Sequence, residues 1–154
     1  MVHATAIDGL KGGRLRVGMI GGGRNAFIGA VHRMAMRLDD LIELKAGALS
    51  SDAENARASG ADLGLAADRS YSDYREMAAR ESARSDGIEA AVIVTPNHLH
   101  FPIAKTFLET GIDVICDKPL STTLAEATEL VELTRAKGLV FAVTLIRWCV
   151  RRAK

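Results

Sequence analysis

The chain has few cysteines, no long apolar run and almost no excess of charge of either sign. Its two cysteines, Cys116 and Cys149, are too few and too isolated for a disulfide framework or a zinc site, so we interpret both as reduced thiols and expect no metal. No apolar run approaches the ~20 residues that cross a bilayer. Residues 1–13 contain no hydrophobic core of the signal-peptide kind. We therefore expect a cytoplasmic protein without a membrane partner.

The charge is almost balanced. Twenty Lys and Arg residues oppose 19 Asp and Glu residues, for a net charge of +1. A nucleic-acid partner requires a concentrated basic face, so we expect none. Only the end of the chain is locally basic, through Arg147, Arg151, Arg152 and Lys154. The 154 residues suffice for one domain with a hydrophobic core.

Apolar strand-like segments alternate with helical patterns along the chain. We expect strands at residues 14–20, 42–49, 88–94, 112–116 and 139–143. This alternation predicts an α/β fold: a Rossmann-type, doubly wound parallel sheet in three layers, joined by right-handed crossovers. We expect a flexible leader at residues 1–13, one domain at residues 14–144 and an atypical tail at residues 145–154.

The helix signals are specific enough to test. Residues between the first two strands recur at helical spacing and predict a single apolar face: Phe27, Ile28, Val31, Met34, Ala35 and Leu38. Capping boxes predict helices that begin at Ser51 and at Thr123. Ser72 and Asn97 are the expected caps of two further helices. The helices that begin at Ser51, Asn97 and Thr123 are expected to end at Gly60, Gly111 and Gly138, respectively.

A glycine-rich loop separates the first strand from the first helix. Gly21 to Ala26 fits the pattern G-x-G-x-x-A. Gly21 permits the tight turn, Gly23 permits close approach of a pyrophosphate, and Ala26 keeps the helix near the sheet. The helix N-terminus then faces the phosphates. We expect this loop to bind a dinucleotide through Gly21, Gly23, Arg24, Asn25, Ala26 and Phe27; the alternative is a turn without a ligand.

The tip of the second strand carries the signal for the choice of cofactor. NAD sites usually offer a carboxylate there to the adenosine ribose. This chain offers Ser50 and Ser51, and Asp52 is better explained as a first-turn helix residue. The two hydroxyls suit a 2′-phosphate, with Arg57 one helical turn away. The preference is therefore for NADP, with NAD as the alternative because short hydroxyls also suit it.

Two further segments end strands at the edge where open α/β sheets bind ligands. One runs from Thr95 to His100 and includes Pro96 and Asn97. The other is Asp117-Lys118-Pro119. A lysine beside a nicotinamide can hydrogen-bond a substrate oxygen, and burial can lower its pKa.

Together these segments resemble the Gfo/Idh/MocA family of oxidoreductases. The resemblance covers residues 14–144 and rests on Gly21–Gly29, Thr95–His98 and Asp117–Pro119. The family commonly has Glu where this chain has Asp117. Three motifs in the right order are far more specific than the glycine loop alone.

The resemblance implies a two-domain enzyme that transfers hydride between the nicotinamide of NAD or NADP and a small sugar, polyol or related carbonyl substrate. By this likeness the glycine loop holds the pyrophosphate, and Thr95, Pro96 and Asn97 line the nicotinamide side. Lys118 orients the substrate oxygen and is the expected catalytic residue. His100, Asp117 and Pro119 complete the expected cofactor site. Full-length members are homo-oligomers, and their second domain supplies the substrate pocket.

The chain departs from the family pattern after Thr144. Family members continue with a different stretch, which leads into the second domain. We interpret residues 145–154 as the product of a frameshift or a sequence error, or else as the tail of a stand-alone domain. In either case we expect cofactor binding without turnover, and self-association through apolar surface that the missing domain would cover.

Two other classes of protein share the glycine loop. A non-catalytic, redox-sensing module is the main alternative, although no DNA-binding element is visible. A methyltransferase would want an acidic residue at the tip of the second strand, and Ser50-Ser51 argues against it. His98 and His100 suit first-turn or packing positions better than a metal site, because no third ligand lies near them in sequence. His32 is expected to be structural or at the surface.

Overall fold

The computed structural model describes residues 13–24 and 26–145. Five parallel strands form one sheet in the order β2-β1-β3-β4-β5. The strands are β1 (Leu15–Gly21), β2 (Ile42–Ala48), β3 (Ala90–Val94), β4 (Asp113–Asp117) and β5 (Phe141–Thr144). The predictions for Asn25, for Cys149 and for most of the leader and the tail lie outside the described residues.

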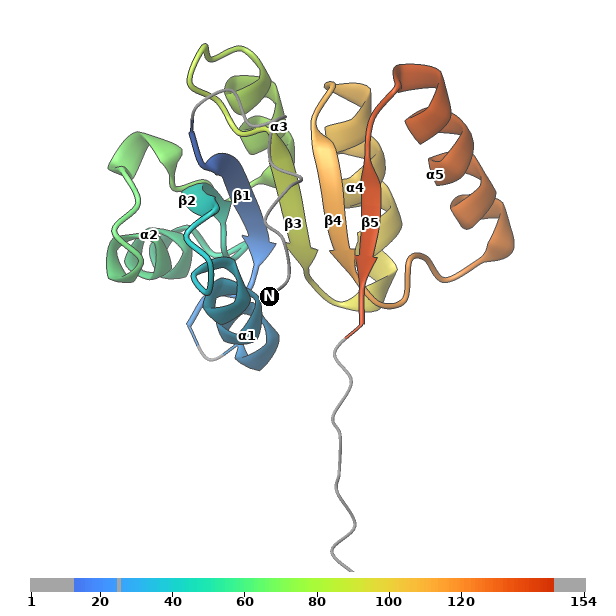
Figure 1. The fold of residues 1–154 in the computed structure, drawn as a ribbon. Helices are drawn as coiled ribbons and strands as arrows, with labels where there is room; N and C mark the ends of the chain where they lie inside the picture. Colours follow the sequence, from blue (N-terminus) through green and yellow to red (C-terminus); the bar gives the residue numbers. More distant parts are fainter. Residues whose placement is uncertain (1–12, 25, 146–154) are drawn as a thin grey trace, which may run out of the picture.

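Helices connect the strands and bring every strand back in the same direction. The α-helices are α1 (Phe27–Met36), α2 (Ala53–Asp62), α3 (Tyr74–Ser82), α4 (His100–Glu109) and α5 (Leu124–Lys137). Two short 3₁₀ helices, η1 (Ala67–Arg69) and η2 (Asn97–Leu99), precede α3 and α4. None of the helices in these ranges is long and apolar enough to cross a membrane. All arrowheads point to one edge of the sheet, the carboxyl edge (Figure 1).

The sheet separates two apolar clusters. One contains Val17, Met19 and Val92 from the sheet and Met36 from α1. The other joins Ile93 to α3, α4 and α5, and its members include Met77, Ile103, Phe107, Leu108 and Leu130. The predicted doubly wound, three-layer α/β fold is confirmed, and strands β1 and β3 are covered on both sides.

The predicted apolar face of α1 is wrong at four of its six positions, whereas Ile28 is half-buried and packs against the core. The residues of α1 that are buried are Gly29, His32 and Met36, whereas Phe27 and Met34 are 69% and 67% exposed. The cause is the close packing of Gly29 on the glycine loop, which turns that side of the helix inward. Two further members of the predicted face are also exposed, Ala35 and Leu38.

Three predicted helix caps are also wrong, each by a short distance. Asp52, rather than Ser51, caps α2 and accepts a hydrogen bond from the Asn55 N–H at 2.7 Å. Asp73, rather than Ser72, caps α3. Asn97 caps no α-helix, because it begins η2. In the first two cases a carboxylate one position later offers a stronger acceptor than a hydroxyl.

The helix α5 follows its prediction at both ends. Thr123 and Glu126 form a reciprocal capping box, and Gly138 ends the helix in the left-handed conformation, φ +66°. Only Leu130 of α5 is buried. An ion pair of 2.6 Å between Lys105 and Glu129 links α4 to α5.

A buried ionic cluster fixes the segment between η1 and β3. Arg69 pairs with Glu81, and both side chains are nearly inaccessible. Glu81 also accepts hydrogen bonds from the Tyr71 hydroxyl at 2.8 Å and from the Ile88 N–H at 3.3 Å. Burial, followed by the contact with Glu81, raises the pKa of Tyr71 to about 12. This cluster lies outside the three sequence motifs and holds the scaffold behind β2 and β3.

Candidate functional site

The glycine loop begins where β1 reaches the carboxyl edge. Gly21 and Gly22 have φ angles of +80° and +74°, a region that other residues rarely adopt. A Cβ atom on Gly23 would lie 2.7 Å from the carbonyl oxygen of Leu49 and 2.8 Å from Ser59 Oγ. The turn predicted at Gly21 is therefore present, and Gly23 is required for contact with β2 and α2.

Hydrogen bonds hold the glycine loop in place on both sides. The Gly23 N–H donates to the Leu49 carbonyl at 3.2 Å, which ties the loop to the tip of β2. The Arg24 N–H donates to Ser59 Oγ of α2 at 3.0 Å. On the other side, an Arg33 guanidinium N–H donates to the Gly22 carbonyl at 2.7 Å. These contacts hold the loop ready for a ligand.

No side chain among the described residues caps the N-terminus of α1. Ala26 occupies the N-cap position without a side-chain hydrogen bond, and the first turn contains no acidic residue. In α2, α3 and α5, by contrast, a side chain accepts from a first-turn N–H. The first N–H groups of a helix need an acceptor, and the positive end of the helix dipole favours an anion. The start of α1 therefore fits a phosphate group.

The tip of β2 lies beside this helix start. Ser50 is half-buried and its Oγ accepts a hydrogen bond from the Asp52 N–H at 3.1 Å. Ser51 is exposed. The Asp52 carboxylate caps α2 by accepting a hydrogen bond from the Asn55 N–H. Arg57 is exposed, and its Nε donates to the Ala53 carbonyl at 3.1 Å.

Arg24 leaves the loop toward α2. Its guanidinium forms a two-pronged ion pair with Asp62, with nitrogen–oxygen distances of 2.6 and 2.8 Å. Both side chains are 51% exposed. The hydrogen bond from Arg24 lowers the pKa of Asp62. Both residues border a hollow between α1 and α2 that Phe27, Arg33 and Ser59 also line.

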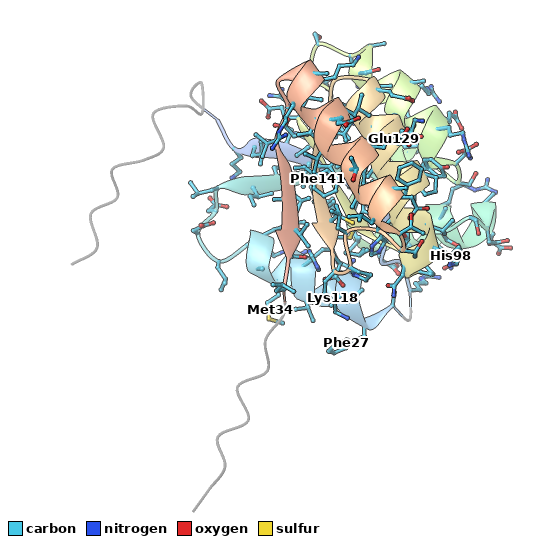
Figure 2. All side chains as sticks on the ribbon, turned by 90° about the vertical axis from the view of Figure 1, so that its right-hand side faces the viewer. Phe27, Met34, His98, Lys118, Glu129 and Phe141 are labelled. Carbon is cyan, nitrogen blue, oxygen red and sulfur yellow. The ribbon has the colours of Figure 1, made fainter. Side chains whose placement is uncertain are left out.

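The loop after β3 forms the next part of the carboxyl edge. Thr95 follows β3 directly, and its Oγ1 is buried without a hydrogen-bond partner among the residues that the structure describes. Pro96 and Asn97 are exposed. Buried hydroxyls normally have a partner, so the orphaned oxygen marks a place where a bound group fits. His98, next in the loop, is exposed and points outward (Figure 2).

His100 joins two loops instead of facing the edge. Its side chain is almost completely buried. Nδ1 lies 2.6 Å from the carbonyl oxygen of Pro119, and Nε2 lies 2.9 Å from that of Thr95. Because both ring nitrogens are occupied, His100 positions the Thr95 and Pro119 segments relative to each other. The sequence suggested a cofactor contact here, and the ring has no free nitrogen for one.

Lys118 follows β4 and is exposed at the same end of the sheet as Phe27 (Figure 2). The Lys118–Pro119 peptide bond is cis. Asp117, the last residue of β4, is half-buried, and the Thr144 hydroxyl lies 3.4 Å from its Oδ1. The register pairs Asp117 with Thr144, so β5 supports the segment that carries Lys118.

His32 was not recognised as part of this region. It is 8% exposed, and its Nε2 is buried without a hydrogen-bond partner. Burial lowers the pKa of His32, while the Asp117 carboxylate opposes that shift. The only signal for His32 in the sequence is its position three residues after Gly29, on the same helical face.

The described residues contain no group of three or more His, Cys, Asp or Glu side chains that suits a metal ion. Cys116 is a buried free thiol. Burial, with a smaller contribution from Asp117, raises its pKa to about 12. A thiol with such a pKa is a poor nucleophile, so Cys116 serves packing within the strand β4.

The structure thus gathers four predicted segments at one edge: the glycine loop, the tip of β2, the loop after β3 and the segment after β4. It does not bring Arg57 into contact with Ser50, since this arginine borders a separate hollow with Tyr71 and Arg80. Sequence reasoning missed Ser59 and Asp62, which contact the loop from α2 and carry no recognisable motif. It also gave no role to Gly22 or Gly29. The arrangement defines a nucleotide-binding Rossmann domain.

Comparison with known proteins agrees with this class. The family model described as "Oxidoreductase family, NAD-binding Rossmann fold", GFO_IDH_MocA, matches residues 15–145. The chain therefore belongs to the Gfo/Idh/MocA oxidoreductase family, as the motifs predicted, and this part of it is the NAD-binding Rossmann domain.

Similar structures lead to the same family. An oxidoreductase from Sinorhizobium meliloti is 58% identical, with a TM-score of 0.81 over 85% of this chain and 36% of that one. An inositol dehydrogenase homologue from Azotobacter vinelandii, complexed with NAD+, is 43% identical, with a TM-score of 0.84 over 86% of this chain and 34% of that one. An uncharacterized oxidoreductase of Bacillus subtilis is 45% identical over 84% of this chain and 33% of its own length. The chain spans about a third of the length of these relatives.

Proposed function

We propose that this domain binds NADP(H) or NAD(H) along the carboxyl edge of its sheet. In the whole protein it would serve an oxidoreductase that transfers hydride between nicotinamide and a sugar, polyol or related carbonyl compound. The observation that carries the proposal is the uncapped start of α1 behind a loop of three glycines. Free N–H groups, the helix dipole and the absence of side chains suit a pyrophosphate there.

Each segment of the edge has a part in this proposal. The N–H groups at the start of α1 bind the pyrophosphate, and Ser50 and Ser51 bind the adenosine ribose. Thr95, with its unpartnered hydroxyl, lies where the nicotinamide half would fit. His100 keeps this loop and the Pro119 segment in register. The dinucleotide supplies or accepts the hydride.

Lys118 is the proposed catalytic residue. It is exposed at the carboxyl edge, where its ammonium group can donate to a substrate oxygen and assist proton transfer.

The proposed order of preference is NADP over NAD. Ser50 and Ser51 are the side chains at the tip of β2, and the nearest carboxylate, Asp52, is engaged with Asn55. No carboxylate stands at the strand tip itself, where its charge would repel a 2′-phosphate. The Azotobacter relative, in contrast, was solved with NAD+, so a direct comparison of the two dinucleotides is required.

A charge placed at Ala26 tests the proposed binding site. In Ala26→Asp the carboxylate caps α1, so the fold is retained, but it repels the pyrophosphate. We expect the Kd for NADPH and NADH, measured by nicotinamide fluorescence, to rise at least about tenfold. Ala26→Ser is the matched control, since it supplies a cap without charge and should change either Kd by less than about threefold.

Two results would contradict the proposal. One is a folded wild-type chain that binds neither dinucleotide. The other is an Ala26→Asp variant that binds both dinucleotides with the affinity of the wild-type chain, because the pyrophosphate would then not lie at the start of α1. Gly23→Val is a poorer test, since its side chain would collide with the Leu49 carbonyl and alter the fold.

A further inference from the structure

NADP differs from NAD by a 2′-phosphate on the adenosine ribose. A cationic side chain near the tip of β2 would therefore favour NADP. Arg57 borders a separate hollow, with Tyr71 and Arg80, and not the one at the glycine loop. Arg33 is engaged with the carbonyl of Gly22. Arg24 is the remaining candidate. Its backbone is fixed beside the tip of β2, because its neighbour Gly23 hydrogen-bonds to Leu49.

The side chain of Arg24 is held by a carboxylate alone. Its Nε and one terminal nitrogen bind the two oxygens of Asp62. Both side chains are half-exposed. An exposed ion pair contributes little stability, because water screens it. A phosphate accepts the same two-pronged contact and carries more negative charge than a carboxylate, so it competes well for the guanidinium.

We propose that Arg24 is the residue that distinguishes NADP from NAD, and that Asp62 is the counter-ion it leaves when the 2′-phosphate binds. Asp62 is then a specificity residue that opposes NADP by competing for Arg24. With NAD bound, the Arg24–Asp62 pair stays closed. This inference rests on the proposed function, since it assumes that a dinucleotide occupies the carboxyl edge.

The proposal gives opposite predictions for the two partners. Arg24→Gln removes the phosphate contact, so the Kd for NADPH should rise about tenfold while the Kd for NADH changes less than about twofold. Asp62→Asn removes the competitor, so the Kd for NADPH should fall about threefold, with the Kd for NADH unchanged. Arg24 and Asp62 are both exposed, so neither change should disturb the core.

A second ion pair supplies matched controls. Arg14 and Asp40 form an exposed pair at 2.6 Å at the opposite, amino edge of the sheet. Arg14→Gln and Asp40→Asn alter the net charge by the same amounts. Asp40 has φ +61°, a conformation that Asn also tolerates. Both controls should leave the two dissociation constants unchanged, which separates a local contact from an effect of overall charge.

The experiment is a fluorescence titration of the full 154-residue chain and its four variants with NADPH and NADH. A change confined to NADPH, upward in Arg24→Gln and downward in Asp62→Asn, supports the inference. Equal weakening of both dinucleotides by Arg24→Gln would mean that Arg24 binds the shared pyrophosphate, and it would overturn this inference alone. No change in either variant would overturn it too. A folded wild-type chain that binds neither dinucleotide would overturn the proposed function and the inference with it.

Discussion

Gly29 of α1 and Gly22 of the glycine loop pack backbone against backbone. A Cβ atom on Gly29 would lie 2.4 Å from the Cα atom of Gly22 and 2.8 Å from its carbonyl oxygen. The absence of two side chains thus lets α1 begin directly behind the loop. This contact aims the helix start at the carboxyl edge, and it decides which face of α1 is buried.

Gly29→Ala should therefore destabilise the domain. In an open helix this change stabilises by about 1 kcal/mol. Here the new methyl group meets backbone atoms that cannot move aside, so we expect the free energy of unfolding to fall by about 2 kcal/mol. Urea unfolding followed by circular dichroism measures this. Gly13→Ala is the control, since nothing lies within 4 Å of its added Cβ; a stabilised Gly29→Ala variant would contradict the packing described.

The same contact explains where sequence reasoning succeeded and where it failed. The positions of the strands and of the glycine loop follow from apolar segments and from spacing, which are local properties. The buried face of α1 does not, because Gly29 turns His32 inward and leaves Phe27 and Met34 outside. A helical wheel predicts the buried face from the apolar side chains alone. It cannot predict a backbone contact that forms because a glycine has no side chain.

The site was predictable to a similar extent. Ser50 and Lys118 follow strands, so the parallel topology brings them to one edge. Asp62 lies ten residues beyond Asp52, and no sequence motif marks it as a site residue. Its contact with Arg24 depends on how α2 packs. The bridging role of His100 depends likewise on the path of the Pro119 segment, which a sequence alone does not specify.

The buried ion pair between Arg69 and Glu81 gives a second stability prediction. Glu81→Gln removes the buried charged partner of Arg69 and leaves it the exposed Asp86 carboxylate at 3.2 Å, so the free energy of unfolding should fall by about 2 kcal/mol. The exposed pair of Arg80 and Glu76, 3.0 Å apart, is the control, and Glu76→Gln should lower it by no more than about 0.5 kcal/mol. Equal effects in urea unfolding would show that the Arg69 cluster is not buried as described.

His32 predicts a pH dependence of stability. Its pKa is lowered in the folded state, so the unfolded chain binds a proton more readily than the folded one. Stability is then full above the unfolded pKa of about 6.5 and decreases as the pH falls through and below that value. Urea unfolding across this range should show a fall that is absent from His32→Gln. The same slope in both proteins would assign the effect to other groups.

The outer face of α1 predicts self-association. Phe27 and Met34 are largely exposed, and exposed apolar side chains on one helix favour contact with another molecule. Sedimentation velocity should show concentration-dependent association that Met34→Glu reduces. Ala79, a small exposed residue of α3, is the control position, and Ala79→Glu should have no effect. A wild-type chain that remains monomeric at high concentration would contradict the prediction.

In the proposed function a dinucleotide lies across the carboxyl edge of the sheet, and every other assignment at the site depends on this position. Amide chemical shifts of the 15N-labelled chain, recorded while NADPH is added, test this claim directly. We predict saturable shifts at Gly22, Gly23, Ser50 and Lys118, with none at Gly87 and Gly138, which precede β3 and β5 at the amino edge. Shifts centred on the amino edge, or no shifts from a folded chain at saturating NADPH, would contradict the claim.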